Sequence, residues 1–157
     1  MRLLIVDDHA VIRRGIQSIL RAWPEWEISG EASNGAEAVQ LAASLKPEIV
    51  LMDISMPGMN GLEASRAIRK TNPEIKIILL TLHDSLEGMR TAFKAGARGY
   101  LLKSDTEAEM MRALEIVAAN GIYVSPRLDQ TRLAQLLGEL GLDGALPATA
   151  RTGNGAV

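Results

Sequence analysis

Four short aliphatic runs in this chain end at polar side chains that could carry out chemistry together. The runs LLIV, IVLM, IKIILL and GYLL are followed by Asp7-Asp8, Asp53, Thr81 and Lys103, respectively. Such runs, rich in Ile, Leu and Val without alternation, are typical of parallel strands buried on both faces. Parallel strands end at one edge of their sheet, where open α/β sheets bind ligands. We therefore expect the carboxylates, the hydroxyl and the ammonium to converge there.

Three carboxylates gathered at neutral pH repel one another, and a cation relieves that repulsion. Oxygen ligands without His or Cys favour Mg²⁺, which keeps several waters and also accepts phosphoryl oxygens. Lys103 would add a second positive charge, and Thr81 would add a hydroxyl donor. This set meets the needs of phosphoryl transfer, which depends on positioning and charge neutralisation. One of the Asp residues is the expected acceptor, because no Ser has a recognisable activating base and the chain has no Cys.

The elements that must position these groups follow from the hydrophobic pattern. Strands are predicted at Leu3–Val6, Ile28–Ala32, Ile49–Met52, Ile75–Leu80 and Gly99–Leu102. Helical patterns separate them, and the first is expected to face the sheet with Ile12, Ile16, Ile19, Leu20 and Trp23. Five strand-then-helix units predict an α/β fold with a five-stranded, doubly wound parallel sheet. Ser104-x-x-Glu107 predicts a capping box at the start of the fifth helix.

The pattern changes after Gly121. Ser125-Pro126 is expected to open a sixth helix, with the stripe Leu133, Leu136, Leu137 and Leu140. From Gly141 onward the residues are mostly Gly, Ala, Pro and Thr, which cannot bury a core. We therefore expect one domain over residues 1–121, followed by a linker helix and a low-complexity tail over residues 122–157.

Composition limits the partners. The net charge is −2 and the basic residues are scattered, so no nucleic-acid contact by this segment is expected. The absence of cysteine removes disulfide and thiolate chemistry. Met1 runs into a strand-like segment without a cationic leader, and no apolar run approaches the length of a membrane span. A cytoplasmic protein without membrane contact is the expectation.

The segments LLIVDDH, IVLMDISMPGMNGLEA, ILLTLHD and AGARGYLLKSD, in this order, resemble the receiver domain of two-component response regulators. The resemblance covers Met1 to about Asn120. It implies the flavodoxin-like form of this α/β fold, Mg²⁺ as cofactor and a sensor histidine kinase as phosphoryl donor. It also implies a homodimer on phosphorylation as the output step, and a signalling switch in place of an enzyme.

The resemblance also assigns roles to individual positions. Asp53 would be the phosphoacceptor. Asp8, Asp53 and the main-chain carbonyl of Ser55 would bind the metal, and Asp7 would hold it through water. Thr81 and Lys103 would bind phosphoryl oxygens, and Tyr100 would be the switch aromatic. Ser104 stands where many receivers have Pro, which leaves the isomer of the Lys103–Ser104 peptide bond open.

Several alternatives remain at this point. The GIYVSP segment and the helix beyond it resemble the LuxR/NarL-type class, whose DNA-binding helix-turn-helix domain has no counterpart in this sequence. A truncated transcriptional regulator and a stand-alone receiver that binds a protein are both open. An Asp-nucleophile, Mg²⁺-dependent phosphatase would need a second Asp where Ser55 stands. A flavin binder would need a glycine-rich phosphate loop where DDHAVIRRG stands. Asp8 could instead cap the first helix, and His9 is expected only near the site.

Overall fold

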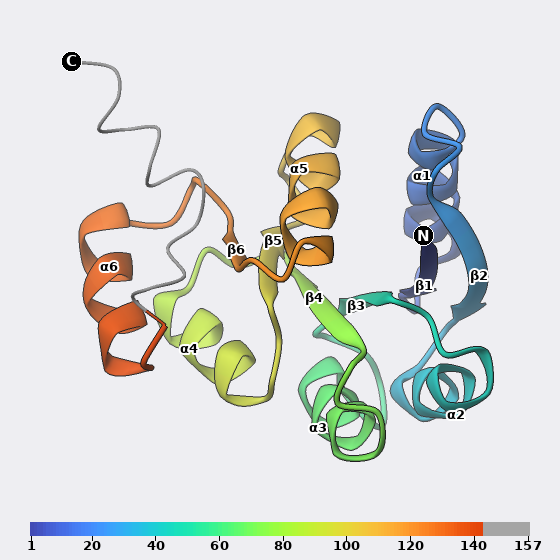
Figure 1. Ribbon diagram of the computed structural model, residues 1–157, viewed down its shortest axis with the longest axis horizontal. Coiled ribbons are helices and arrows are strands. Elements are labelled where there is room, and N and C mark those ends of the chain that lie inside the picture. The colour runs from blue at the N-terminus through green and yellow to red at the C-terminus, as the bar shows by residue number, and fades with distance from the viewer. Residues whose placement is uncertain (143–157) are drawn as a thin grey trace.

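The computed structural model describes residues 1–142, which form one six-stranded parallel sheet covered by helices on both faces (Figure 1). The strands are β1 (Arg2–Val6), β2 (Glu27–Ala32), β3 (Ile49–Asp53), β4 (Lys76–Thr81), β5 (Gly99–Leu102) and β6 (Tyr123–Val124). Their spatial order is β2-β1-β3-β4-β5-β6. Every neighbouring pair is parallel. The predicted fold class is thereby confirmed.

In the described part of the chain, six helices connect and flank the strands. They are α1 (Ala10–Leu20), α2 (Gly35–Leu45), α3 (Gly61–Thr71), α4 (Leu86–Lys94), α5 (Glu107–Ala118) and α6 (Gln130–Glu139). Helices α1 and α5 cover one face of the sheet, and α2, α3 and α4 cover the other (Figure 1). Alternate residues of a strand point to opposite faces, so Leu3 and Ile5 of β1 join one hydrophobic cluster while Leu4 and Val6 join the other.

The sixth strand was not predicted. Only Tyr123 and Val124 belong to it, so its apolar run is too short to stand out in the sequence. Its pairing with β5 is nevertheless regular, because Tyr123 N–H donates to the Arg98 carbonyl at 3.0 Å and Ser125 N–H donates to the Tyr100 carbonyl at 2.9 Å. The sheet therefore continues just past residue 121, the expected end of the first domain.

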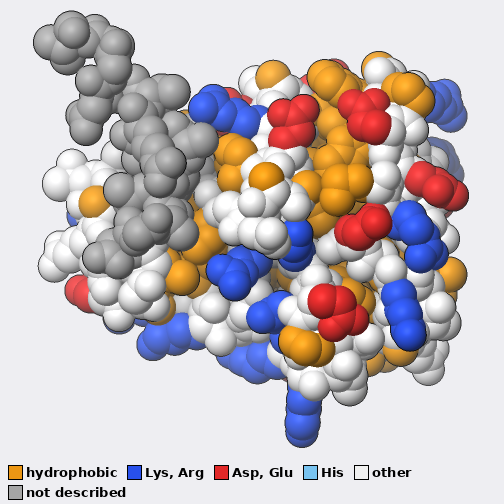
Figure 2. All heavy atoms as spheres, in the orientation of Figure 1, with side chains coloured by type: hydrophobic (Ala, Val, Ile, Leu, Met, Phe, Trp, Pro, Cys, Tyr) orange, Lys and Arg blue, Asp and Glu red, His pale blue; other side chains and the backbone are white. Residues whose placement is uncertain are grey.

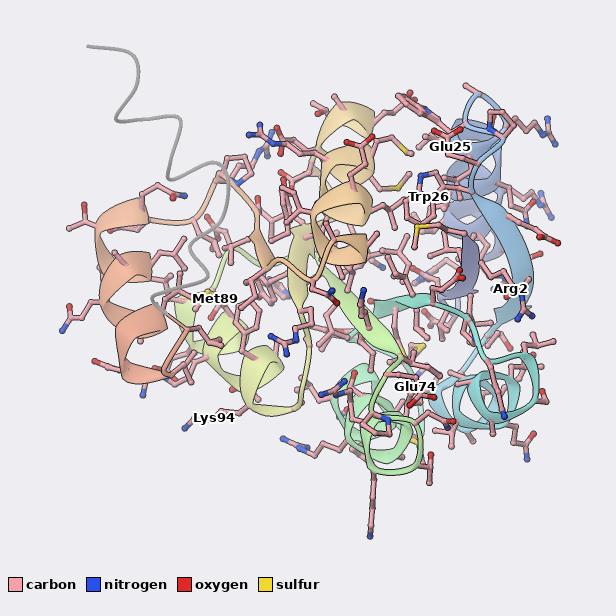
Figure 3. The ribbon with its side chains drawn as sticks, in the orientation of Figure 1. Arg2, Glu25, Trp26, Glu74, Met89 and Lys94 are labelled. Carbon is pink, nitrogen blue, oxygen red and sulfur yellow. The ribbon has the colours of Figure 1, made fainter. Side chains whose placement is uncertain are left out.

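The first helix is shorter than its apolar pattern implied. It ends at Leu20, and Trp23, which was predicted to face the sheet, is 37% exposed. Trp26 is 6% exposed instead and packs with Ile16 and Leu20. Its ring points from the connection between α1 and β2 toward the space between α1 and α5 (Figure 3). The helical period could not be extended across the turn at Arg21–Ala22, which changes the direction of the chain.

Two helix starts also differ from prediction. Thr106 caps α5 by accepting the Glu109 N–H at 3.2 Å, so the predicted capping box at Ser104 is wrong. Helix α6 begins at Gln130 with Asp129 as its cap, because the chain around Ser125 is used by the sheet. The predicted stripe is confirmed for Leu133, Leu136 and Leu137, which are buried. The predicted low-complexity tail, apart from its first two residues, lies outside the described residues.

Basic side chains gather below α5 on the face seen in Figure 2. A cavity of about 250 Å³ there is lined in part by Arg69, Lys76 and Arg98. Lys76 donates to the Ala118 carbonyl at the end of α5, and Arg69 donates to the Pro73 carbonyl after α3. Cations near helix carboxyl ends are favourable because they satisfy free carbonyls and oppose the helix dipole.

Within residues 1–142, no helix is both long and apolar enough to cross a membrane.

The burial of the two tryptophans predicts different effects on stability. We expect Trp26→Ala to lower the free energy of unfolding by about 3 kcal/mol, because it leaves a large cavity between α1 and α5. Trp23→Ala removes a ring that is already partly solvated and should cost less than about 1 kcal/mol. Urea unfolding followed by circular dichroism measures both. Equal losses in the two variants would contradict the assignment of Trp26 to the core.

Candidate functional site

An acidic cluster lies at the carboxyl edge of the two neighbouring strands β1 and β3. Val6 is in register with Met52, so the residues that follow them, Asp7 and Asp53, lie side by side. Asp7, Asp8, His9 and Asp53 each offer one ligand atom, and these atoms all lie within 4.8 Å of one another. Asp7 and Asp53 are buried. The predicted convergence of the three carboxylates is thus present.

Lys103 bridges this cluster from β5. Its Nζ lies 3.1 Å from Asp7 Oδ2 and 3.2 Å from Asp53 Oδ2, and its side chain is only 10% exposed. Its own N–H donates to the Thr81 carbonyl at 2.8 Å, which fixes the end of β5 against β4. One ammonium is therefore shared by two buried carboxylates.

The protonation equilibria reflect this arrangement. Burial and the nearby Asp7 carboxylate raise the pKa of Asp53, against the opposing effect of Lys103 and the Ser55 N–H. Burial works to lower the pKa of Lys103, but the hydrogen bond to Asp7 and the charges of Asp53 and Asp7 outweigh it and raise that pKa. The Lys103 ammonium is thus held in its charged form between the two carboxylates.

The donor set fits a hard divalent cation. Asp7 Oδ2, Asp8 Oδ1 and Asp53 Oδ2 are buried and have no hydrogen bond from residues 1–142, although Lys103 or His9 lies close to each. Buried polar atoms without partners are costly. Carboxylate oxygens are the ligands that Mg²⁺ takes in proteins, usually with several waters retained. A Mg²⁺ ion would therefore find its oxygen ligands at this edge.

His9 lies beside the cluster, as expected, and is mostly in solvent. Its Nδ1 is 3.1 Å from Asp7 Oδ1 and 3.1 Å from Asp8 Oδ1, and its side chain is 65% exposed. His9 is also the N-cap residue of α1, and no side chain caps that helix. The alternative in which Asp8 serves as the helix cap is therefore wrong.

The loop after β3 closes tightly on Asp53. Ser55 N–H donates to Asp53 Oδ1 at 3.2 Å. A Cβ atom on Gly61, the first residue of α3, would lie 2.2 Å from the Asp53 carbonyl oxygen, so only glycine allows this close approach. Gly58 has φ +74°, which accounts for the first glycine of the MPGMNG turn. The sequence of this turn thus sets the orientation of Asp53.

Thr81 and Tyr100 both hydrogen-bond to the backbone of His83. Thr81 Oγ1 accepts the His83 N–H at 3.1 Å, and the Tyr100 hydroxyl donates to the His83 carbonyl at 3.1 Å. The Tyr100 ring is buried, and burial raises the pKa of its hydroxyl. A Cβ on Gly88 of α4 would lie 2.7 Å from that hydroxyl, so the ring occupies space that the glycine leaves.

Two polar residues around the site were not singled out by sequence reasoning. Asp105 accepts the Leu102 N–H at 2.9 Å and the Ser125 hydroxyl at 3.1 Å. Arg13 donates to the Asp7 carbonyl at 2.6 Å. A polar residue in a loop or on a helix carries no signal of its own, so these contacts become visible only when β6 and α1 are in place. The Lys103–Ser104 peptide bond, left open by the sequence, is trans.

The shared ammonium leads to a stability prediction. We expect Lys103→Met to lower the free energy of unfolding in EDTA by about 3 kcal/mol, because two buried carboxylates lose their counter-charge. Mg²⁺ should restore part of the loss by binding the same oxygens. The control is Lys94→Met on α4, whose side chain points away from the body of the protein (Figure 3) and should change stability little. Equal losses in the two variants in EDTA would refute the role of Lys103 as a counter-charge.

The family described as response regulator receiver domain matches residues 3–115. The transcriptional regulatory protein DegU of Brevibacillus brevis is 36% identical over 82% of this chain and 54% of its own length. The nitrate/nitrite response regulator protein NarL of Escherichia coli K12 is 37% identical over 85% of this chain and 62% of its own length. The chain therefore spans between half and two thirds of these relatives.

Solved structures of response regulators are similar to this chain as well. A LuxR-family two-component response regulator from Aurantimonas sp. SI85-9A1 has a TM-score of 0.78 and 34% identity, covering 90% of this chain and 97% of that one. The receiver domain of the putative response regulator NarL from Mycobacterium tuberculosis has a TM-score of 0.72 and 32% identity, covering 75% and 95%. With its order of strands and its acidic edge, this chain belongs to the response regulator receiver family and is of the LuxR/NarL type.

Proposed function

We propose that the protein accepts a phosphoryl group on Asp53 from a sensor histidine kinase, and that the modified receiver is the signalling state. The observation that carries this proposal is a buried Asp53 that forms an ion pair with Lys103, inside an acidic cluster whose buried oxygens accept no hydrogen bond from residues 1–142. A purely structural carboxylate would have its hydrogen bonds satisfied within the fold.

In this proposal Asp8, Asp53 and the Ser55 carbonyl hold Mg²⁺ directly, and Asp7 holds it through a water. When bound, Mg²⁺ would neutralise charge on the carboxylates and on the incoming phosphoryl oxygens. Lys103, already beside Asp53 Oδ2, would pair with one of those oxygens. The Thr81 hydroxyl would donate to another. Positive charge and donors are thereby fixed before the phosphoryl group arrives, which is the main protein contribution in phosphoryl transfer.

The transfer itself requires no further protein nucleophile. An Asp53 carboxylate oxygen forms a bond to phosphorus while the bond between phosphorus and the kinase histidine nitrogen breaks. The nitrogen retains the electron pair of that bond, and the aspartyl phosphate that results is an acyl phosphate. Attack by water returns Asp53 and inorganic phosphate. This slow loss resets a switch, so the protein is proposed to act in signalling and not as a turnover enzyme.

Thr81 and Tyr100 are proposed to change position when Asp53 is phosphorylated. Both side chains contact the backbone of His83, Thr81 at its N–H and Tyr100 at its carbonyl. A Thr81 hydroxyl that turns toward a phosphoryl oxygen changes its contact with the His83 N–H. The His83 carbonyl, which lies in the next peptide group and accepts from Tyr100, then shifts with the same residue. The surface around α4 and β5 then shifts between two states, and a homodimer on phosphorylation is the proposed consequence.

For the output we favour a transcriptional regulator, with residues 1–121 as the receiver, residues 122–157 as linker, and DNA contact made outside this segment. The names of the relatives support this, since DegU of Brevibacillus brevis and LiaR of Bacillus subtilis are transcriptional regulatory proteins. A cytoplasmic location accords with that role. The alternative is a receiver that acts alone by binding a protein. The nucleotide sequence downstream of Val157 distinguishes the two.

The acceptor assignment is tested by native mass spectrometry. With Mg²⁺ and acetyl phosphate we expect one added phosphoryl group on the wild-type chain, none without Mg²⁺, and none on Asp53→Asn. Asp84→Asn is the matched control, because Asp84 is an exposed aspartate in the neighbouring loop and should leave labelling intact. Full labelling of Asp53→Asn would disprove the acceptor role. Turnover of a generic phosphate ester would instead support the phosphatase alternative.

The metal ligands are tested separately by calorimetric titration. We expect Asp8→Ala to weaken Mg²⁺ binding at least tenfold, because it removes a carboxylate ligand and one of the negative charges that attract the ion. Asp84→Ala, outside the cluster, should bind Mg²⁺ like the wild type. An unchanged affinity in Asp8→Ala would count against the metal site.

A further inference from the structure

Helix α6 is seated on the side of α4 that lies away from the sheet centre. It lies beside α4, past β6, at the end of the sheet (Figure 1), and Met89 of α4 lies on the side that faces it (Figure 3). Leu133, Leu136 and Leu137 of α6 are buried in the same hydrophobic cluster as Met89 and Phe93 of α4. Arg90 of α4 adds an ion pair to Glu139 of α6 at 2.6 Å. The surface against which α6 packs is therefore formed mostly by α4.

One series of contacts joins this surface of α4 to Thr81. The Thr81 hydroxyl accepts a hydrogen bond from the His83 N–H, and the His83 carbonyl accepts one from the Tyr100 hydroxyl. That hydroxyl occupies the space that a side chain at position 88 would fill, because Gly88 has none. Gly88 lies in the first turn of α4, one residue before Met89. A change at Thr81 therefore reaches the helix on which α6 rests through two hydrogen bonds and the close approach of the Tyr100 hydroxyl to Gly88.

A second set of hydrogen bonds joins the segment before α6 to the turn that follows Lys103. The segment between β6 and α6 is fastened to the two residues after Lys103: the buried Ser125 hydroxyl donates to Asp105, and Arg127 donates to the Ser104 hydroxyl at 3.0 Å. Ser125 N–H also donates to the carbonyl of Tyr100. The same short segment is thus hydrogen-bonded to Tyr100 and to the two residues that follow Lys103.

We propose that α6 is a phosphorylation-released helix, docked on α4 while Asp53 is free and loosened when Asp53 carries a phosphoryl group. The inference rests on the proposed phosphorylation of Asp53. A phosphoryl group takes Lys103 and Thr81 away from their present partners, Asp53 and the His83 N–H. The turn after β5 and the start of α4 then shift together, and α6 loses its fit to both. The α4 surface beneath it becomes available.

Hydrogen exchange read by mass spectrometry tests this on the whole 157-residue chain. Samples with Mg²⁺, with and without acetyl phosphate, are divided so that intact mass gives the phosphorylated fraction and peptides report exchange. We expect amides of α6 to exchange at least tenfold faster in the phosphorylated protein, and those of the remote helix α2 to remain unchanged. Phosphoryl uptake with unchanged or slower exchange in α6 would overturn the inference and leave the proposed function standing. No uptake would remove both.

Because coupling between two sites is reciprocal, loosening α6 must favour phosphorylation. Glu139→Gln removes the ion pair to Arg90 from the α6 side and leaves the receiver core untouched. We expect it to raise α6 exchange in the unmodified protein about threefold and to speed phosphoryl uptake from acetyl phosphate by a similar factor. Glu115→Gln is the matched control, since Glu115 is exposed on α5 and has no ion pair within residues 1–142. Faster exchange without faster uptake would show that α6 is docked but not coupled.

Discussion

The ammonium of Lys103, held between two buried carboxylates, is the contact on which the rest of the structure depends. Asp7 and Asp53 are placed side by side by the pairing of β1 with β3, and each lies within about 3 Å of the same nitrogen. Buried charges are tolerated only when they are paired. One cation does not balance Asp7, Asp8 and Asp53, so the edge remains short of positive charge. That deficit is what makes it a place for Mg²⁺.

The parallel sheet is the means by which four separate segments reach this edge. Asp7, Asp53, Thr81 and Lys103 lie at or directly after the ends of β1, β3, β4 and β5, which are consecutive in the sheet. Their separation is therefore set by strand spacing and not by loop conformation. Loops supply the fine orientation: Gly61 brings α3 against the Asp53 carbonyl, where any side chain would collide. The rigid strands and the tight turn together hold Asp53 in one position.

The sequence predicted the sheet edge well because its signals are local. Asp53, Thr81 and Lys103 each follow an unbroken aliphatic run, and a buried parallel strand is the structure that such a run favours. Errors arose where packing at a distance decided the outcome. Trp23 continues the helical spacing of α1, but the chain turns after Leu20 and buries Trp26 instead. Ser125-Pro126 has the composition of a helix start, yet the backbone of Ser125 completes the pairing of β6 with β5.

The same misassigned segment has physical importance. An edge strand as short as β6 gains little from its own two residues, so its place depends on side-chain contacts such as the bond between Ser125 and Asp105. That bond is made to the turn that carries Lys103, whose ammonium is held by Asp53. A change of charge at Asp53 therefore acts on a weakly held edge, where a small free energy suffices to shift a docked helix. The interior strands, buried on both faces, have no such freedom. A signal that starts at Asp53 should consequently leave the protein through the β6 side of the sheet, where α4 and α6 meet.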